Sequence, residues 1–189
     1  MSFNPALVSA TTSATFVHGG KVVDLPVRSG TIGGDHLVVA FQAPIDGDPS
    51  DFTRIGVVDL ASGMWSFYLY PLDRTASGDL TGLSEVLHLG DQKFAAIERD
   101  GKGGKASIKW LTTFDLRSLA GAAPDAVPHR LAKRRAVDLV PLFVAANRKI
   151  EKEIEGLAMG LDGEVYAVTD SDNERVTLLL RLGKAQELF

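Results

Sequence analysis

The chain of 189 residues contains no cysteine. Disulfides, zinc sites built on thiolates and thiol nucleophiles are therefore excluded. No apolar run approaches the roughly 18 residues that a membrane-spanning helix needs. Residues 1–13 do not read as a signal peptide, because no basic stretch precedes an apolar one. The formal net charge of −4 argues against a large nucleic-acid-binding surface. We therefore expect neither a membrane nor a nucleic acid as partner.

Several common catalytic patterns are also missing. Ser84 lies in no Gly-x-Ser-x-Gly elbow, and the glycines at 101–104 lack the Walker spacing. The four histidines are scattered without metal-ligand spacing. Serine-triad, nucleotide-loop and histidine-metal chemistry thus have no support in the sequence.

The dominant period of the sequence is two, with glycine and aspartate clusters between short apolar runs. This pattern is typical of antiparallel β-strands joined by tight turns. We predict strands at 21–25, 36–42, 54–59, 65–70, 84–89, 94–99, 105–115, 135–137, 155–159, 165–169 and 176–181. No strand-helix-strand alternation is visible, so the fold class expected is all-β.

Three segments depart from this pattern. Residues 140–153 carry helix formers after Pro141 and predict one short inserted helix. Residues 120–128 are small and contain proline, which predicts an exposed loop. Residues 1–20 carry little regular signal and are expected to form a loose arm.

A hairpin with acids at corresponding ends occurs twice, at residues 83–101 and 154–173. A repeated supersecondary unit suggests a repeat architecture. Converging carboxylates suit calcium, which takes oxygen ligands. The same strand-end acids can instead cap turns or pair with bases such as Arg99. The run from Asp170 to Glu174 lacks the EF-hand pattern, so a polar turn competes there with a cation loop.

The hairpins group into units of four short strands, as in a β-propeller blade. About three to four antiparallel blades are expected, forming a partial propeller within a single domain or fragment spanning 1–189. The clearest blades cover 54–137 and 153–182. Trp65, Trp110 and Phe114 are expected to pack within blades.

The sequence resembles the phytase-like proteins with the "esterase-like activity of phytase", which are similar to β-propeller phytases. The resemblance rests on Gly82-Leu83-Ser84-Glu85, Glu98-Arg99-Asp100-Gly101, Val137-Asp138-Leu139, Ile154-Glu155-Gly156 and the run ending in Asp170-Ser171-Asp172-Asn173. It covers roughly residues 54–182.

The resemblance implies a propeller whose channel holds calcium on acidic side chains. By motif, the ligands would be Glu155 and Asp170, with Asp172 as a neighbour. Glu85 and Glu98 would be their counterparts in the preceding hairpin. Arg99 would contact the phosphate of a substrate bidentately. Because neighbouring strand residues face opposite ways, only one of Glu98 and Arg99 would point to the channel.

The function expected from the resemblance is a calcium-dependent phosphoric-ester hydrolase acting on a small-molecule phosphoester, in a periplasmic or secreted location. The alternative is a non-catalytic propeller, either stabilised by calcium or binding a protein. The family closes a ring of about six blades, and closed propellers have at least about four. With about three visible here, the chain is a fragment, closes the ring as a homodimer, or uses its N-terminal part differently.

Overall fold

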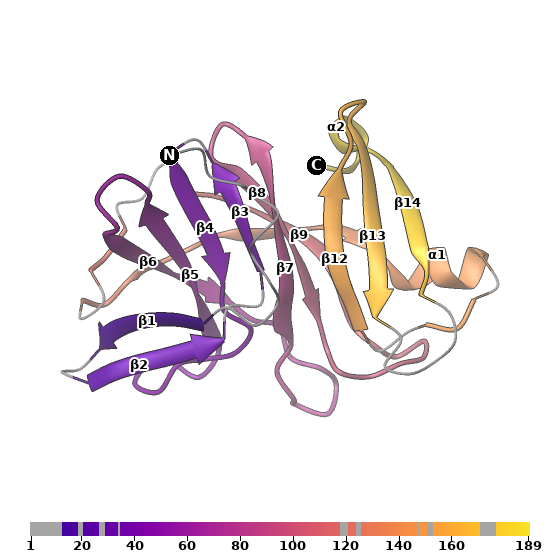
Figure 1. Ribbon diagram of the computed structural model, residues 1–189. Helices are drawn as coiled ribbons and strands as arrows, with labels where there is room; N and C mark the ends of the chain where they lie inside the picture. The colour runs from indigo at the N-terminus through magenta and orange to yellow at the C-terminus, as the bar shows by residue number, and fades with distance from the viewer. Residues whose placement is uncertain are drawn as a thin grey trace.

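The computed structural model describes residues 13–18, 21–26, 29–33, 35–117, 121–123, 126–146, 148–150, 153–170 and 177–189, the side chains only from residue 35 onward. Within these ranges the chain forms fourteen strands and two short helices (Figure 1). The prediction of an all-β fold is confirmed. In the described part of the chain, neither helix has the length and apolarity to cross a bilayer.

The strands form three sheets and a separate hairpin. The hairpin pairs β1 (Ser13–His18) with β2 (Lys21–Pro26). Sheet 1 has the order β10-β6-β5-β4-β3, with β3 (Ser29–Gly33), β4 (His36–Ala40), β5 (Phe52–Asp59), β6 (Trp65–Pro71) and β10 (His129–Arg130). Sheet 2 has the order β11-β9-β8-β7, with β7 (Gly82–Gly90), β8 (Lys93–Arg99), β9 (Lys109–Asp115) and β11 (Lys133–Asp138). Sheet 3 contains β12 (Glu153–Met159), β13 (Glu164–Asp170) and β14 (Leu179–Lys184) in chain order. The helices are α1 (Val140–Ala145) and α2 (Ala185–Leu188).

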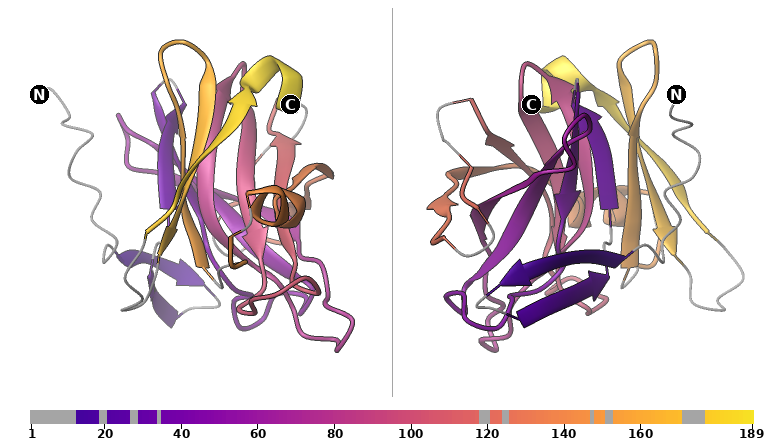
Figure 2. Two further views of the ribbon diagram at one scale, coloured as in Figure 1. Left: turned by 90° about the vertical axis from the view of Figure 1, so that its right-hand side faces the viewer. Right: turned by 60° about the vertical axis from the view of Figure 1, so that its left-hand side comes forward.

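In each of the three sheets, the strand that comes first in the chain forms one edge, and each later strand is added further from that edge. The first strands β3, β7 and β12 lie next to one another, while the later strands fan away from them (Figure 1). All pairings except that of β10 with β6 are antiparallel. Figure 1 shows sheet 2 between sheet 1 and sheet 3, and the views in Figure 2 show the hairpin of β1 and β2 at the lower end of the sheets. The shared inner edge is therefore where three sheets can bring side chains together.

Sheet 2 is buried on both faces, because successive side chains along its strands enter two different cores. Along β8, Phe94 and Ala96 enter the core shared with sheet 1, whereas Ala95 and Ile97 enter the core shared with sheet 3. A strand covered on both sides reads as a continuous apolar run. This explains why the run from Phe94 to Ile97 is fully apolar although the fold is antiparallel.

Several predicted boundaries differ from the structure. Within the arm predicted over 1–20, Ser13–His18 is paired as β1 in a separate hairpin, and residues 1–12, 19 and 20 lie outside the described residues. The strand predicted at 105–115 begins only at Lys109, since the preceding residues close a loop in which the Asp100 N–H donates to the Ile108 carbonyl at 3.1 Å.

The helix predicted at 140–153 ends at Ala145. Only Val140 and Phe143 of α1 are buried, so further turns would not rest on the core. The chain instead brings Ile150 into the core between sheets 2 and 3 before β12 begins. Burial of one side chain thus outweighs helix propensity here.

Candidate functional site

The inner strands β7 and β12 each contain an extra residue near their first residues, and β7 has a second register shift between His88 and Gly90. In β7, Leu83 pairs with Glu98 and Glu85 pairs with Ile97, which leaves Ser84 as the bulged residue. In β12, Ile154 pairs with Thr169 and Gly156 pairs with Val168, which leaves Glu155 as the bulged residue. Bulges redirect side chains and often occur beside active sites. The two bulges face each other, because Ser84 Oγ donates to the Ile154 carbonyl at 2.7 Å.

The pairing of the strands corrects the equivalence that the sequence suggested between the acids of the two hairpins. Glu85 and Glu98 were expected to be the counterparts of Glu155 and Asp170. The bulges instead align Ser84 with Glu155, and the pairing with the neighbouring strand aligns Arg99 with Asp170. The two hairpins are therefore equivalent in backbone, but their acids are offset by one residue, and in a strand one residue reverses the face.

Glu85 is partly buried between the two bulged strands. Its carboxylate accepts the N–H of Val86 at 2.9 Å and the N–H of Leu157. Burial raises the pKa of Glu85 to about 7, the two N–H donors oppose the shift, and the charge of Glu155 adds to it. Glu155 is thus close enough to disfavour the ionisation of Glu85.

Arg99 provides the positive charge at this site. Its guanidinium, 7% exposed, forms an ion pair with Glu155, and Glu153 lies 3.9 Å away. Its Nε is buried and has no hydrogen-bond partner among the described residues. An unsatisfied buried donor is costly and is uncommon in native proteins. One donor of Arg99 is therefore left unsatisfied inside the protein.

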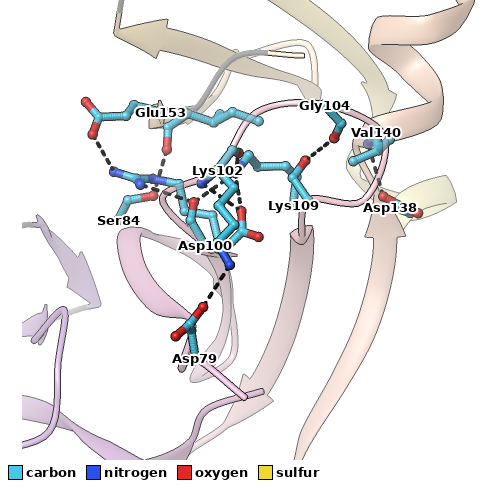
Figure 3. A network of polar contacts seen from close by, with 12 residues as sticks. Asp79, Ser84, Asp100, Lys102, Gly104, Lys109, Asp138, Val140 and Glu153 are labelled. Atoms are coloured by element: carbon cyan, nitrogen blue, oxygen red, sulfur yellow. Dashed lines mark hydrogen bonds and ion pairs between the residues drawn. The ribbon is translucent and has the colours of Figure 1, made fainter. Parts of the chain in front are cut away.

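A buried ion pair fixes the backbone next to Arg99. Lys109 is fully buried, and its Nζ donates to Asp100 Oδ1 at 2.7 Å and to the carbonyls of Asp100 and Lys102 at 2.8 Å each. Lys102 Nζ extends the network to Asp79 at 2.7 Å (Figure 3). Burial lowers the pKa of Lys109, while its bond to Asp100 opposes this. Asp100 Oδ2 is the second buried atom without a partner among the described residues.

Glu98 lies on the opposite face of β8, toward sheet 1. Its oxygens accept from Tyr70 Oη at 3.0 Å, Thr81 Oγ1 at 2.6 Å, the N–H of Asp73 at 2.6 Å and Lys133 Nζ at 2.6 and 2.8 Å. The side chain is fully buried. Burial, followed by the charge of Glu98, raises the pKa of Tyr70. The opposite orientation of Glu98 and Arg99 confirms the expectation from strand alternation.

The remaining predicted ligands lie at the end of β13. Asp170 is exposed and lies opposite Glu153 in the pairing of β12 with β13. Asp172 lies outside the described residues. Among those that the structure describes, no three His, Cys, Asp or Glu side chains are grouped so that they could hold a metal ion. The site that the structure assembles thus consists of Glu85, Glu155 and Arg99.

Three contributors to this site were not singled out from the sequence. From the sequence, Ser84 was considered only as a nucleophile, and no ion pair between Asp100 and Lys109 was predicted. Asp100 follows Glu98-Arg99 directly, so its place in the repeated phrase was the one available signal. The partner Lys109 is brought to it by the closure of the loop after β8.

Comparison with known proteins identifies the family. The chain matches the family described as phytase-like, esterase-like activity of phytase, over residues 29–174. This chain belongs to the phytase-like family. Neither the curated proteins nor the solved structures gave a match. The matched segment contains both bulged strands and the Glu98-Arg99-Asp100 phrase, so the candidate site lies within the family's own region.

Proposed function

We propose that the chain is a calcium-dependent phosphoric-ester hydrolase of the phytase-like type. The observation that carries the proposal is the cluster of Glu85, Glu155 and Arg99 at two facing bulges, with one unpaired Arg99 donor. Membership of the phytase-like family supports a phosphoester as the substrate. The cluster combines carboxylates for a cation with a guanidinium for an anion, which is the pairing of charges that a phosphoester requires.

We propose further that sheets 1, 2 and 3 are consecutive blades of a β-propeller. Supporting this, each sheet starts at the shared inner edge and proceeds outward, and neighbouring strands are antiparallel except for the short outer strand β10. In a propeller, blades are arranged in this way around a central channel. The candidate site would then open toward the channel from β7 and β12.

Glu85 and Glu155 fit part of a calcium site. Both are carboxylates, and the pKa of Glu85 is raised because burial and Glu155 disfavour its charge. A divalent cation near both would favour the ionised forms. Calcium takes six to eight oxygens, so the remaining ligands must come from backbone carbonyls, water, another chain or residues such as Asp172. Glu98, whose oxygens are bonded to Lys133 and three other donors, contributes to folding instead.

The side chains of the site have distinct roles in this proposal. Bound calcium would neutralise phosphate oxygens and lower the pKa of a coordinated water. Arg99 would contact a phosphate oxygen once Glu155 releases its guanidinium, and the low exposure of the side chain would keep that interaction strong. Asp100 and Lys109 hold the backbone that positions Arg99. Glu155 must exchange its bond with Arg99 for the cation when the site is loaded.

The test is phosphate release from inositol hexakisphosphate and from p-nitrophenyl phosphate, with calcium or with EDTA. Wild type is expected to turn over only with calcium. Glu155→Gln is expected to lower turnover by about a hundredfold or more, as for loss of an electrostatic contact to the transition state. Glu187→Gln, an exposed carboxylate on α2, is the control and should match wild type. Turnover that is indifferent to EDTA, or that survives Glu155→Gln, would contradict the proposal.

A second candidate function is a non-catalytic propeller, and one observation favours it. Arg99 and Glu155 already neutralise each other, and Ser84 binds Ile154, so the same residues fasten sheet 2 to sheet 3. In that case calcium would raise the melting temperature without turnover. Measuring both turnover and the effect of calcium on the melting temperature, on one protein sample, separates the two candidate functions.

We also propose that a second copy of the chain completes the ring. The face of sheet 3 turned away from sheet 2 carries Val168 beside Leu179, and Leu179 is 70% exposed. An exposed apolar sheet face favours association. Light scattering should give twice the chain mass of 20.2 kDa. A monomer at all concentrations, with and without calcium, would overturn the dimer.

A further inference from the structure

Arg99 lies close to two carboxylates of β12. Its Nη2 donates to Glu155, and Glu153 Oε1 lies 3.9 Å from the same nitrogen (Figure 3). A separation of 3.9 Å is too long for a hydrogen bond but short enough for an ion pair. In the structure, Glu155 therefore has the hydrogen bond, whereas Glu153 contributes only its charge.

The two acids approach Arg99 from one strand. Residues two apart in a strand point to the same face and lie about 7 Å from each other. Glu153 begins β12, and Glu155 is the bulged residue, where the strand bends. The two side chains therefore reach the guanidinium from neighbouring positions.

The arginine depends on this pairing more than the acids do. The side chain of Arg99 is 7% exposed, whereas those of Glu153 and Glu155 are each 31% exposed. A buried cation that loses its acid is strongly destabilised, while a carboxylate at the edge of solvent can be hydrated instead. If Glu155 turns away, Arg99 therefore needs another carboxylate.

The other acids near Arg99 are bound elsewhere. Asp100 Oδ1 accepts from Lys109 at 2.7 Å, and Glu85 accepts two backbone N–H groups. Burial lowers the pKa of Lys109, while Asp100 and the charge of Glu153 oppose this shift. Glu153 thus lies near both buried cations, and it is the described carboxylate placed to pair with Arg99.

We propose that Glu153 is the second partner of Arg99 and binds its guanidinium when Glu155 leaves it. Shortening the 3.9 Å separation to about 2.8 Å requires only rotation of side chains. A guanidinium has five donors, so Glu153 can accept from one while others face a bound anion.

Glu153 is thus a positioning residue, which keeps Arg99 in place while Glu155 is engaged elsewhere. The exchange rests on the proposed function only for what draws Glu155 away, which in the proposed hydrolase is the cation. The exchange itself requires no more than the loss of the bond between Arg99 and Glu155.

A triple-mutant cycle, measured by urea unfolding of the full chain in EDTA, tests the exchange. Alanine replaces the acids, because glutamine would keep an oxygen for the guanidinium. Glu153→Ala should raise the unfolding equilibrium constant about twofold in wild type, where Glu155 holds Arg99. With Glu155→Ala present, the same change should raise it about tenfold or more, because the buried guanidinium then has neither carboxylate. With Arg99→Met present, Glu153→Ala should have the same effect whether or not Glu155 is replaced.

Glu187→Ala is the matched control, since it removes an exposed carboxylate from α2 and should have the same effect with and without Glu155→Ala. An effect of Glu153→Ala that is equal in wild type and in Glu155→Ala would overturn the exchange. If the two alanines together prevent folding, adding Arg99→Met should restore it, and a triple variant that stays unfolded would also overturn the exchange. Neither calcium nor a phosphoester enters this measurement, so a failed hydrolase leaves the exchange standing, and a failed exchange leaves turnover to its own assay.

Discussion

Replacing Glu85 by glutamine should make the stability of the protein less dependent on pH. The carboxyl of Glu85 has its pKa raised from 4.5 to about 7 in the folded chain, chiefly by burial. Below pH 4.5 the group is protonated in both the folded and the unfolded state and does not affect stability. As the pH rises from 4.5 to 7, the unfolded chain releases the proton first, so the folded state loses stability relative to it. Above pH 7 the loss is complete.

The size of this effect follows from the two pKa values. A difference of 2.5 units corresponds to about 3 kcal/mol at most. Since Glu85 is only partly buried, about 2 kcal/mol between pH 5 and pH 8 is the working expectation. Glutamine has nearly the same shape and keeps an oxygen for the Val86 and Leu157 donors, while it has no charge to desolvate.

The assay is urea unfolding of wild type and Glu85→Gln at pH 5 and pH 8, in EDTA so that no cation masks the charge. The free energy of unfolding of the variant relative to wild type should increase by about 2 kcal/mol from pH 5 to pH 8. Glu155→Gln should reproduce a smaller part of the gain, because it removes one of the causes of the shift. If the free energies of unfolding of Glu85→Gln and wild type differ by the same amount at pH 5 and pH 8, the reasoning is refuted.

Two further variants test the packing that supports the site. Lys133→Met leaves the fully buried Glu98 carboxylate without its cation, and thermal unfolding should show a loss of stability of about 3 to 5 kcal/mol. Adding Glu98→Gln should recover part of this loss. A double variant no more stable than the single variant would show that Lys133 acts by packing alone. Gly156→Ala puts a methyl group 2.5 Å from Val168 Cγ1 and should cost about 1 to 3 kcal/mol. Val168→Ala in the same chain should relieve it, and an unchanged melting temperature in Gly156→Ala would mean that β12 shifts freely.

The strands were largely predictable because each has a clear local signal. Turn residues such as Asp162 and Gly163 stand between runs that alternate or are wholly apolar, and local sequence decides such hairpins. The segment after Val140 was harder, since its helix formers favour a longer helix than the core can support. The helix ends where it does because Ile150 must pack in the core between sheets 2 and 3. This is a tertiary effect that helix propensity alone does not include.

The site was predictable only in part for a related reason. Glu85, Glu155 and Arg99 were all singled out from the repeated phrases, and the structure does bring them together. Glu98 was singled out in the same way but faces Tyr70 and sheet 1. Which residues of a strand share a face depends on its register, and the sequence does not reveal where an extra residue enters.

The bulges explain why the repeated acids do not repeat their roles. With no bulge, Ser84 and Glu85 would point to opposite faces of sheet 2. The extra residue lets both act toward sheet 3, where Ser84 binds the Ile154 carbonyl and Glu85 accepts the Leu157 N–H. The position of Glu155 in β12 is therefore filled by a serine in β7, so that β7 brings one acid, Glu85, to a junction where β12 already places Glu153 and Glu155 near Arg99. Had position 84 also carried glutamate, one more carboxylate would have met the same arginine, and repulsion among the acids would have opposed the pairing of sheets 2 and 3. The offset by one residue thus limits the number of acids at the junction, and the sheets remain joined.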